Sequence, residues 1–461
     1  MKTGIGIATI AGIAMGLGTA AHAESLADAL AAAYQNNPTL LAQRASLRAT
    51  DETLSQAVAG WRPTITDSAS AGYTKQPSFF SQITGTGGGT QILNSRSNQI
   101  SINQPIFDGL QTPYRVKQAN RQILAGRAQL EATEQNIFLQ TVTAYVDVIQ
   151  YLAVLELDAN NITVLQRTLE ATRDQFRVGE NTRTDVAQAE ARLAAAQSDR
   201  LSAQAQVSAA RAAYKSVVGD MPGTLDPVPA LPKLPESQDV ALQLALQTNP
   251  ALQQAVYTEE ASRKAIAVAK GSLLPSLSIQ ASRSDSKGSY SNGPATYNDR
   301  ITANLTIPLY QSGAEYSRIR QAKENNSRDR LNIETERRSV TQDVTNAWNN
   351  LVAARAVIDS TKEAVRADEI ALDGVRQEAA VGSRTTLDVL NAENELLTQR
   401  VNLVRAERSE YVYAYTLLQA IGQLTAEKLA LPVQYYDPKV HYDRVKDKWI
   451  GFGTGDDADK R

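Results

Sequence analysis

Two aspartates stand at equivalent places in a chain that repeats itself, and an arginine lies close to each. Arg183 lies two residues before Asp185, Arg384 lies four residues before Asp388, and the two aspartates are 203 residues apart (388 − 185 = 203). A carboxylate at the start of a helix accepts hydrogen bonds from free backbone N–H groups and favours the positive end of the helix dipole. Beside an arginine it can also form an ion pair. The residue types therefore leave two roles open, helix capping and ion pairing.

Most other reactive chemistry is missing from the sequence. The 461 residues include no cysteine and two histidines, His22 and His441. Thiolate chemistry, a histidine metal site and a Ser-His-Asp triad are therefore not expected. A phosphate-binding loop of the form G-x-x-x-x-G-K-[ST] is not found, and a net charge of −2 does not favour nucleic-acid binding. We predict no enzyme activity, no metal and no cofactor.

The interval of 203 residues belongs to a duplication of most of the chain. Val178-Gly179 recurs as Val381-Gly382 at that interval. Upstream, Asn37-Pro38 recurs as Asn249-Pro250 at an interval of 212 (250 − 38 = 212). The interval changes because the first copy carries a longer insertion. Such self-similarity predicts two structural repeats, so that functional positions occur in pairs.

The ends of the chain suggest targeting and a tail. Lys2, an apolar stretch and Ala21-His22-Ala23 are typical of a cleaved secretory signal. The boundaries that we predict are a signal peptide at 1–23, a first repeat at 24–219, a proline-rich linker at 220–236, a second repeat at 237–432 and a polar, flexible tail at 433–461.

Long stretches without proline, rich in helix-forming residues, predict two helical hairpins. Each hairpin has a long helix, a turn that contains Gly179 or Gly382, and a shorter return helix. At 1.5 Å per residue the long helices reach roughly 100 Å, which is too long for one globular core. The predicted ranges are 112–177 and 184–218, then 312–380 and 387–421, with further helices of about 30 residues over 26–58 and 240–270.

Four strands complete the predicted repeats, at about 63–74, 96–107, 275–283 and 300–309. Apolar and polar residues alternate in them, although Asp67 falls on an apolar side. Their length of about 10 residues suits a tilted transmembrane strand. Two soluble hairpins are the alternative. If the strands cross a membrane, four cannot close a barrel, so the chain must oligomerise.

The chain resembles an outer-membrane factor of the TolC family over about residues 24–432. The repeated Asn-Pro helices carry the resemblance, as do the strand-to-helix junctions Gln104–Gly109 and Ile307–Gly313. The hairpin tips, residues 176–186 and 381–390, are its most specific part.

The resemblance implies an internally duplicated α+β membrane protein with two long helical hairpins and four transmembrane strands per chain. Three chains would form a twelve-stranded β-barrel that continues as a periplasmic α-helical barrel. Such a homotrimer would pass drugs, small molecules or secreted proteins across the outer membrane of a Gram-negative bacterium. It would do so when docked to a periplasmic adaptor and to an inner-membrane pump or ABC exporter.

The same resemblance assigns roles at the tips. The implied periplasmic gate consists of Asp185, Asp388, Arg384, Arg183 and Phe176. The implied adaptor-docking residues are Val178, Gly179, Val381 and Gly382. Family members often have a tyrosine and a further aspartate where this chain has Ala379 and Asn391, so we expect a gate with fewer bonds. A periplasmic coiled-coil adaptor or structural protein is the alternative function, and it does not account for two strand pairs that follow the duplication.

Overall fold

A computed structural model describes residues 23–77, 90–288 and 294–454. The predicted signal peptide lies almost entirely outside them. The described chain divides into two compact units. The first, called the tip unit, holds residues 23–35, 140–232 and 354–412. The second, called the strand unit, holds the described residues of 36–139, 233–353 and 413–454. Helices α4 (Gln111–Val178) and α8 (Ala314–Ala380) contribute residues to both.

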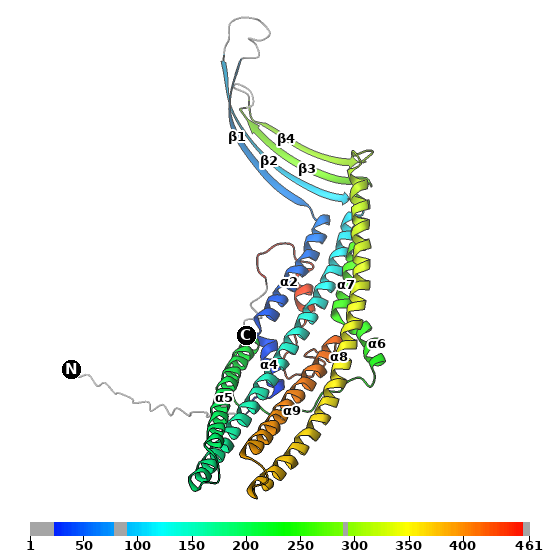
Figure 1. Cartoon of the computed structure of the whole chain (residues 1–461). Helices are drawn as coiled ribbons and strands as arrows, with labels where there is room; N and C mark the ends of the chain where they lie inside the picture. Colours follow the sequence, from blue (N-terminus) through cyan, green and yellow to red (C-terminus); the bar gives the residue numbers. More distant parts are fainter. Residues whose placement is uncertain (1–22, 78–89, 289–293, 455–461) are drawn as a thin grey trace, which may run out of the picture. The chain divides into compact units, whose positions relative to one another are not determined.

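The strand unit contains one antiparallel sheet in the order β1-β2-β3-β4 (Figure 1). The strands are β1 (Thr64–Pro77), β2 (Thr90–Phe107), β3 (Ser276–Lys287) and β4 (Thr296–Thr306). All four strands extend further toward their connecting loops than predicted, and β4 ends at Thr306, before the predicted position 309. The strand register places Asp67 opposite Ile100 on the neighbouring strand.

The two faces of the sheet differ in polarity because side chains alternate along each strand. One face carries hydroxyl and amide side chains across all four strands. Successive rows on that face are Thr64, Asn103, Gln280 and Thr302, then Thr66, Ser101, Ser282 and Arg300, then Ser68, Gln99, Ser284 and Asn298. The opposite face includes an apolar row of Ile65, Ile102, Ala281 and Ile301. The next row on that face, toward the loops, is charged and holds Asp67, Ile100, Arg283 and Asp299. The polar face fits water, and the apolar part of the opposite face fits lipid.

The short helices ahead of the strands differ from the prediction. The helix predicted over 26–58 is interrupted, giving α1 (Leu26–Asn36) and α2 (Pro38–Val58), and the helix over 240–270 gives α6 (Gln238–Thr248) and α7 (Pro250–Gly271). Asn37 and Asn249 adopt extended backbone conformations and accept two backbone N–H groups each. Proline at the following position has no N–H to donate and suits the first position of a new helix. Each Asn-Pro pair therefore ends one helix and starts the next.

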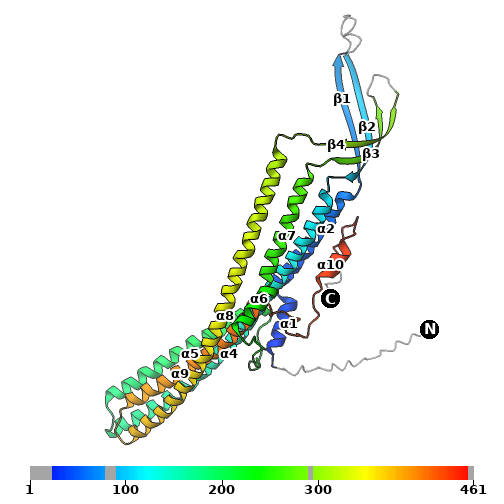
Figure 2. The same ribbon diagram turned by 90° about the vertical axis from the view of Figure 1, so that its right-hand side faces the viewer.

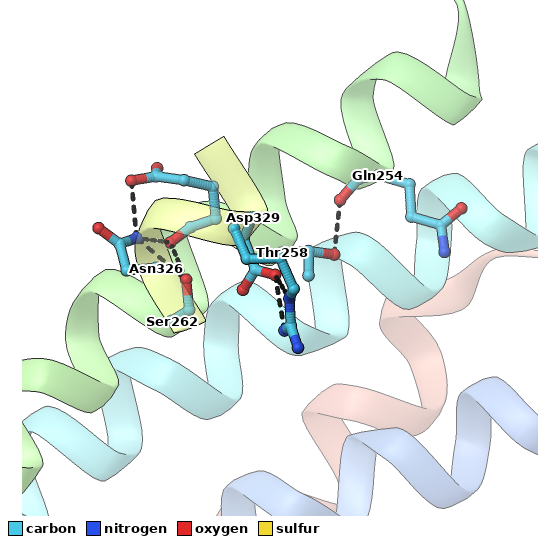
Figure 3. Close-up of polar contacts among 7 residues, drawn as sticks. Gln254, Thr258, Ser262, Asn326 and Asp329 are labelled. Carbon is cyan, nitrogen blue, oxygen red and sulfur yellow. Dashed lines mark hydrogen bonds and ion pairs between the residues drawn. The ribbon is translucent and has the colours of Figure 1, made fainter. Parts of the chain in front are cut away.

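Helix α7 is fastened to α8 by an amide (Figure 3). Asn326 Nδ2 on α8 lies 3.0 Å from Ser262 Oγ and 3.0 Å from Glu259 Oε1, both on α7. Next to it, the guanidinium of Arg328 donates to the buried carboxylate of Asp329 at 2.7 Å. The bonds of Asn326 fix the second copy of the short helix beside its long helix, whereas the Arg328–Asp329 pair lies within α8.

The C-terminal segment is not the flexible tail that its polarity predicted. Residues Pro438–Val445 form helix α10, which lies along α2 (Figure 2). His441 is buried, with Nδ1 3.1 Å from Oδ2 of the fully buried Asp51. Burial raises the pKa of Asp51, although the hydrogen bond to His441 opposes that shift. This contact joins residues far apart in the sequence, so local polarity could not reveal it.

The tip unit is built from the ends of the two hairpins, whose return helices are α5 (Arg183–Val218) and α9 (Thr386–Ala420). All four long helices begin and end within two residues of the predicted positions. A small apolar cluster holds α4, α5 and α9 together and consists of Ile162, Leu165, Leu169, Ala189, Ala196 and Leu390. Within the described residues, α4 alone has an 18-residue window apolar enough to cross a membrane. Half of that window is buried, as in the core helix of a bundle.

Candidate functional site

Both hairpins turn at a glycine with a left-handed backbone. Gly179 has φ +85° and Gly382 has φ +80°. At the second tip the N–H of Gly382 donates to Ala379 O (3.0 Å) and the N–H of Ser383 to Glu378 O (3.0 Å). The first tip forms the equivalent bonds. This pattern satisfies the last carbonyls of a helix and favours glycine because a Cβ is strained at positive φ.

Both return helices begin with a capping box, in which a threonine and an aspartate bond each other's backbone N–H groups. At the first tip, Asp185 Oδ2 accepts from the N–H (2.9 Å) and the hydroxyl (2.6 Å) of Thr182. At the second, Asp388 Oδ2 accepts from the N–H (2.9 Å) and the hydroxyl (2.8 Å) of Thr385. The structure thus assigns both aspartates the capping role. The capping threonines are Thr182 and Thr385, each three residues before its aspartate, and they were not identified from the sequence.

These hydrogen bonds also keep the aspartates charged. The Thr182 hydroxyl lowers the pKa of Asp185, and the backbone N–H of Thr385 lowers the pKa of Asp388. Nearby Arg384 lowers the pKa of Asp388 a little further. Both carboxylates are therefore ionised at neutral pH, so capping and a negative charge at the tip are compatible.

The two tips differ in the bridge that closes each turn. At the second tip, Arg384 Nε donates to Glu378 Oε2 at 2.8 Å, so its ion-pair partner is Glu378 and not Asp388. At the first tip the equivalent positions hold Asn181 and Gln175, and Asn181 Nδ2 donates to Gln175 Oε1 at 2.7 Å. The same geometry is thus neutral in one copy and charged in the other.

The remaining predicted tip residues are exposed to solvent. Phe176 is 45% exposed, Val178 72% and Val381 80%. Arg183 is also exposed, and its guanidinium forms no hydrogen bond or ion pair within the part of the chain that the structure describes. A Cβ added at Gly179 or Gly382 would meet no atom within 4 Å. The tips therefore expose apolar side chains and uncovered backbone at their surface.

Sequence reasoning missed a duplicated ion pair just behind each tip. Arg173 Nη2 lies 2.6 Å from Glu190 Oε1, and Arg376 Nη2 lies 2.9 Å from Glu393 Oε1. The repeat of Ala189-Glu190 as Ala392-Glu393 indicates the glutamates in the sequence, but not their arginine partners. The first pair is exposed, whereas the Glu393 side chain is only 6% exposed.

A second missed contact joins the two hairpins. Arg192 Nη2 on α5 donates to Asn391 Oδ1 on α9 at 2.9 Å. Asn391 stands where the family often has an aspartate, and an amide oxygen accepts this bond as a carboxylate would. In residues 23–77, 90–288 and 294–454, no group of three or more His, Cys, Asp or Glu side chains is placed to hold a metal ion.

An internally duplicated chain with a sheet polar on one face and two capped helical hairpins has the form of an outer-membrane channel. The sequence matches the family described as outer membrane efflux protein over residues 29–220 and 241–423. The chain belongs to that family.

Relatives and solved structures agree with this assignment. The outer membrane efflux protein BepC of Brucella suis is 38% identical over 441 residues, covering 95% of this chain and 94% of BepC. The outer membrane protein TolC of Vibrio cholerae is 28% identical over 425 residues, covering 89% and 93%. The solved structure of CusC superposes with a TM-score of 0.76 at 17% identity, covering 86% of this chain and 91% of CusC.

The fold is therefore that of the TolC-like channel-tunnels, and the chain is an outer-membrane export duct that extends into the periplasm. Its family consists of transport channels. The adaptor or structural-protein alternative is not favoured by these relatives.

Proposed function

We propose that three copies of the chain form the duct, each contributing its four strands to one twelve-stranded barrel. The observation that carries this proposal is the strand order, in which β1 and β4 each have a strand on one side only within the described chain. An open sheet edge leaves backbone N–H and C=O groups without partners in lipid. Pairing β1 of one copy with β4 of the next removes both edges. The family resemblance sets the number of copies at three.

Native mass spectrometry of the detergent-solubilised protein tests this assembly. The expected mass is three times that of the mature chain, with no appreciable monomer. A stable folded monomer or a closed dimer of eight strands would overturn the proposal.

We propose further that a periplasmic adaptor, coupled to an inner-membrane pump or ABC exporter, docks at the hairpin tips. The docking residues are Val178, Gly179, Val381 and Gly382. The family resemblance implies that the tips form a docking groove for a helical hairpin of the adaptor. Two largely exposed valines and two glycines without a close neighbour leave room for such a partner. The tip glycines thus allow the tight turn and also leave space for the adaptor to approach the backbone.

The periplasmic gate, in this proposal, uses the charged residues of the tips. Three copies bring Asp185 and Asp388 into rings of negative charge, which attract cations and can be held closed through arginine. Arg384 and Arg183 are the proposed arginine partners of these rings, and Phe176 supplies apolar bulk where the second copy has Ala379. The Arg384–Glu378 bridge holds the second tip in its turned form.

The cargo is a small molecule such as a drug, or a secreted protein. Relatives carry names of both kinds, since BepC is an efflux protein and AprF of Pseudomonas aeruginosa is an alkaline protease secretion protein. Planar-bilayer recording of the purified wild-type protein tests the duct with its gate. We expect a small, cation-selective conductance. Anion selectivity would contradict a gate lined by carboxylates.

A further inference from the structure

The chain beyond α10 returns to the point where the first strand begins. The carbonyl of Lys448 accepts hydrogen bonds from Arg62 Nη1 (2.7 Å) and Ser55 Oγ (3.2 Å). The Arg62 guanidinium also lies 4.8 Å from the centre of the Trp449 ring. Arg62 stands two residues before the first residue of β1. Three contacts thus fix the C-terminal segment beside the foot of the sheet.

The foot of the sheet is the end at which all four strands connect to helices. There β1 begins, β2 ends at Phe107 opposite Leu277 of β3, and β4 ends at Thr306 opposite Ser276. The carbonyl of Trp61 accepts a hydrogen bond from Gln104 Nε2 of β2 at 2.9 Å. Trp61 and Trp449 are therefore both held at the same end of the sheet. In Figure 2 the segment after α10 runs alongside α2 in this direction.

The segment displays its large apolar side chains instead of burying them. Trp449 is 65% exposed, Ile450 92%, Phe452 106% and Trp61 48%. Val445, a single helical turn earlier, is buried against the helices. The Lys448 ammonium donates to the carbonyl of Gly453, which closes the segment into a compact loop. A fixed loop that presents three large apolar side chains is built to contact an apolar surface.

We propose that residues 449–452, together with Trp61, form an interfacial anchor that inserts into the periplasmic leaflet of the outer membrane. Tryptophan concentrates at membrane interfaces because its ring is apolar and its indole N–H is polar. Arg62 and Lys448 flank the aromatic side chains and suit the phosphates of phospholipid headgroups. The loop is held beside the foot of the sheet, so lipid that surrounds the strands would also contact the loop.

The inside of the duct is a poor alternative location for these side chains. One face of the sheet is lined by hydroxyl and amide groups from every strand, as expected of a water-filled interior. Tryptophan, isoleucine and phenylalanine would remain in contact with water there. On the lipid side they lose that contact, which is favourable.

Fluorescence of single-tryptophan variants in phospholipid vesicles tests the anchor. The chain has three tryptophans, so Trp61→Phe with Trp348→Phe leaves Trp449 alone. Trp61→Phe with Trp449→Phe leaves Trp348, a partly buried residue of α8, as the matched control. The vesicles contain phospholipids brominated either near the carbonyl or near the methyl end of the acyl chains. Circular dichroism and native mass confirm that each variant retains its helices and assembly.

We expect Trp449 to emit at short wavelength and to be quenched most by bromine near the carbonyl end, while Trp348 is not quenched by lipid. Short-wavelength emission without lipid quenching would show that another copy or another protein covers the loop, and would overturn the proposal. Long-wavelength emission quenched by iodide in the buffer would place the loop in water and overturn it too. Each result is independent of gating, because no tip residue is changed.

Discussion

The tip at Val178 and the tip at Val381 share their backbone design. Each ends its first helix with a left-handed glycine and begins its second with a Thr-Asp capping box. They differ in the bridge across the turn, which is the neutral pair Asn181 and Gln175 in one copy and the ion pair Arg384 and Glu378 in the other. The shared glycine and capping box are enough to form the turn in both copies. The charged bridge is not needed for that backbone design, so we infer that it serves the gate.

The largest expected effect comes from the glycine that both tips share. Gly382→Asn keeps a residue that tolerates positive φ but adds a side chain to the docking groove, whereas Gly382→Ala adds a small side chain under strain. If the groove receives an adaptor, asparagine abolishes export and alanine preserves part of it, with trimers intact in both. The measurement is efflux of a fluorescent substrate from cells that depend on this duct.

The reverse order would give the glycine a folding role only. Alanine would then impair export more than asparagine, and native mass would show fewer trimers. Gly179→Asn and Gly179→Ala repeat the comparison at the first tip and show whether both grooves dock a partner.

The next largest effect is expected for the two arginines that form ion pairs behind the tips. Arg376→Ala leaves the buried Glu393 carboxylate without its partner and is expected to lower stability by about 3 kcal/mol. Its counterpart Arg173→Ala breaks an exposed pair and should lower stability by less than about 1 kcal/mol. Helical circular dichroism during thermal unfolding measures both. Equal losses would mean that the second pair is no more buried in the assembled protein than the first.

The capping threonines should give smaller and equal effects. Thr182→Ala and Thr385→Ala each remove one hydroxyl from a capping box, which lowers local helix stability by about 1 kcal/mol. Hydrogen exchange of the first turns of α5 and α9 reports this loss, as a roughly five-fold loss of protection. A loss of protection at only one tip would show that the two capping boxes do not stabilise their helices equally.

At the tips themselves pH should have the smallest effect, because the pH dependence of stability is expected to arise elsewhere in the chain. Burial raises the pKa of Glu134, in α4, to about 7, and its Oε1 accepts the N–H of Ala426 at 2.7 Å. Because the folded state holds this proton more tightly than the unfolded state, stability increases as pH falls from about 7 toward 4.5 and is lost as pH rises. Asp185 and Asp388 have lowered pKa values and stay ionised across that range.

Thermal unfolding at pH 5 and pH 8 checks this assignment. The wild-type protein should be more stable at pH 5, and Glu134→Gln should remove most of the difference. An unchanged difference in the variant would assign the titration to another buried acid, of which Glu131 is the nearest candidate because burial raises its pKa also.

The sequence predicted the hairpins well because their signals are local. Helix-forming residues, the missing prolines and one glycine per turn are all visible along the chain, and the duplication placed each tip twice. The Asn-Pro pairs were visible too, but a side-chain cap that ends one helix and starts the next was not recognised from them.

The predictions that failed concern contacts that the local sequence does not determine. The polar C-terminal segment folds because His441 meets Asp51, 390 residues away. The partner of Arg384 could not be chosen from sequence, since Glu378 and Asp388 both lie close to it in the chain. In the structure the partner is Glu378, because the turn after Gly382 brings Ser383 and Arg384 back to the end of α8.

The most direct test of the account exchanges the bridges between the tips. Glu378→Gln with Arg384→Asn gives the second tip the neutral bridge of the first, and Gln175→Glu with Asn181→Arg gives the first tip the charged one. Single-channel conductance in planar bilayers compares both variants with the wild type. If the ion pair holds the gate, the neutral second tip raises conductance and the charged first tip does not. Unchanged conductance in the first variant, with trimers intact, would contradict a gate at the second tip.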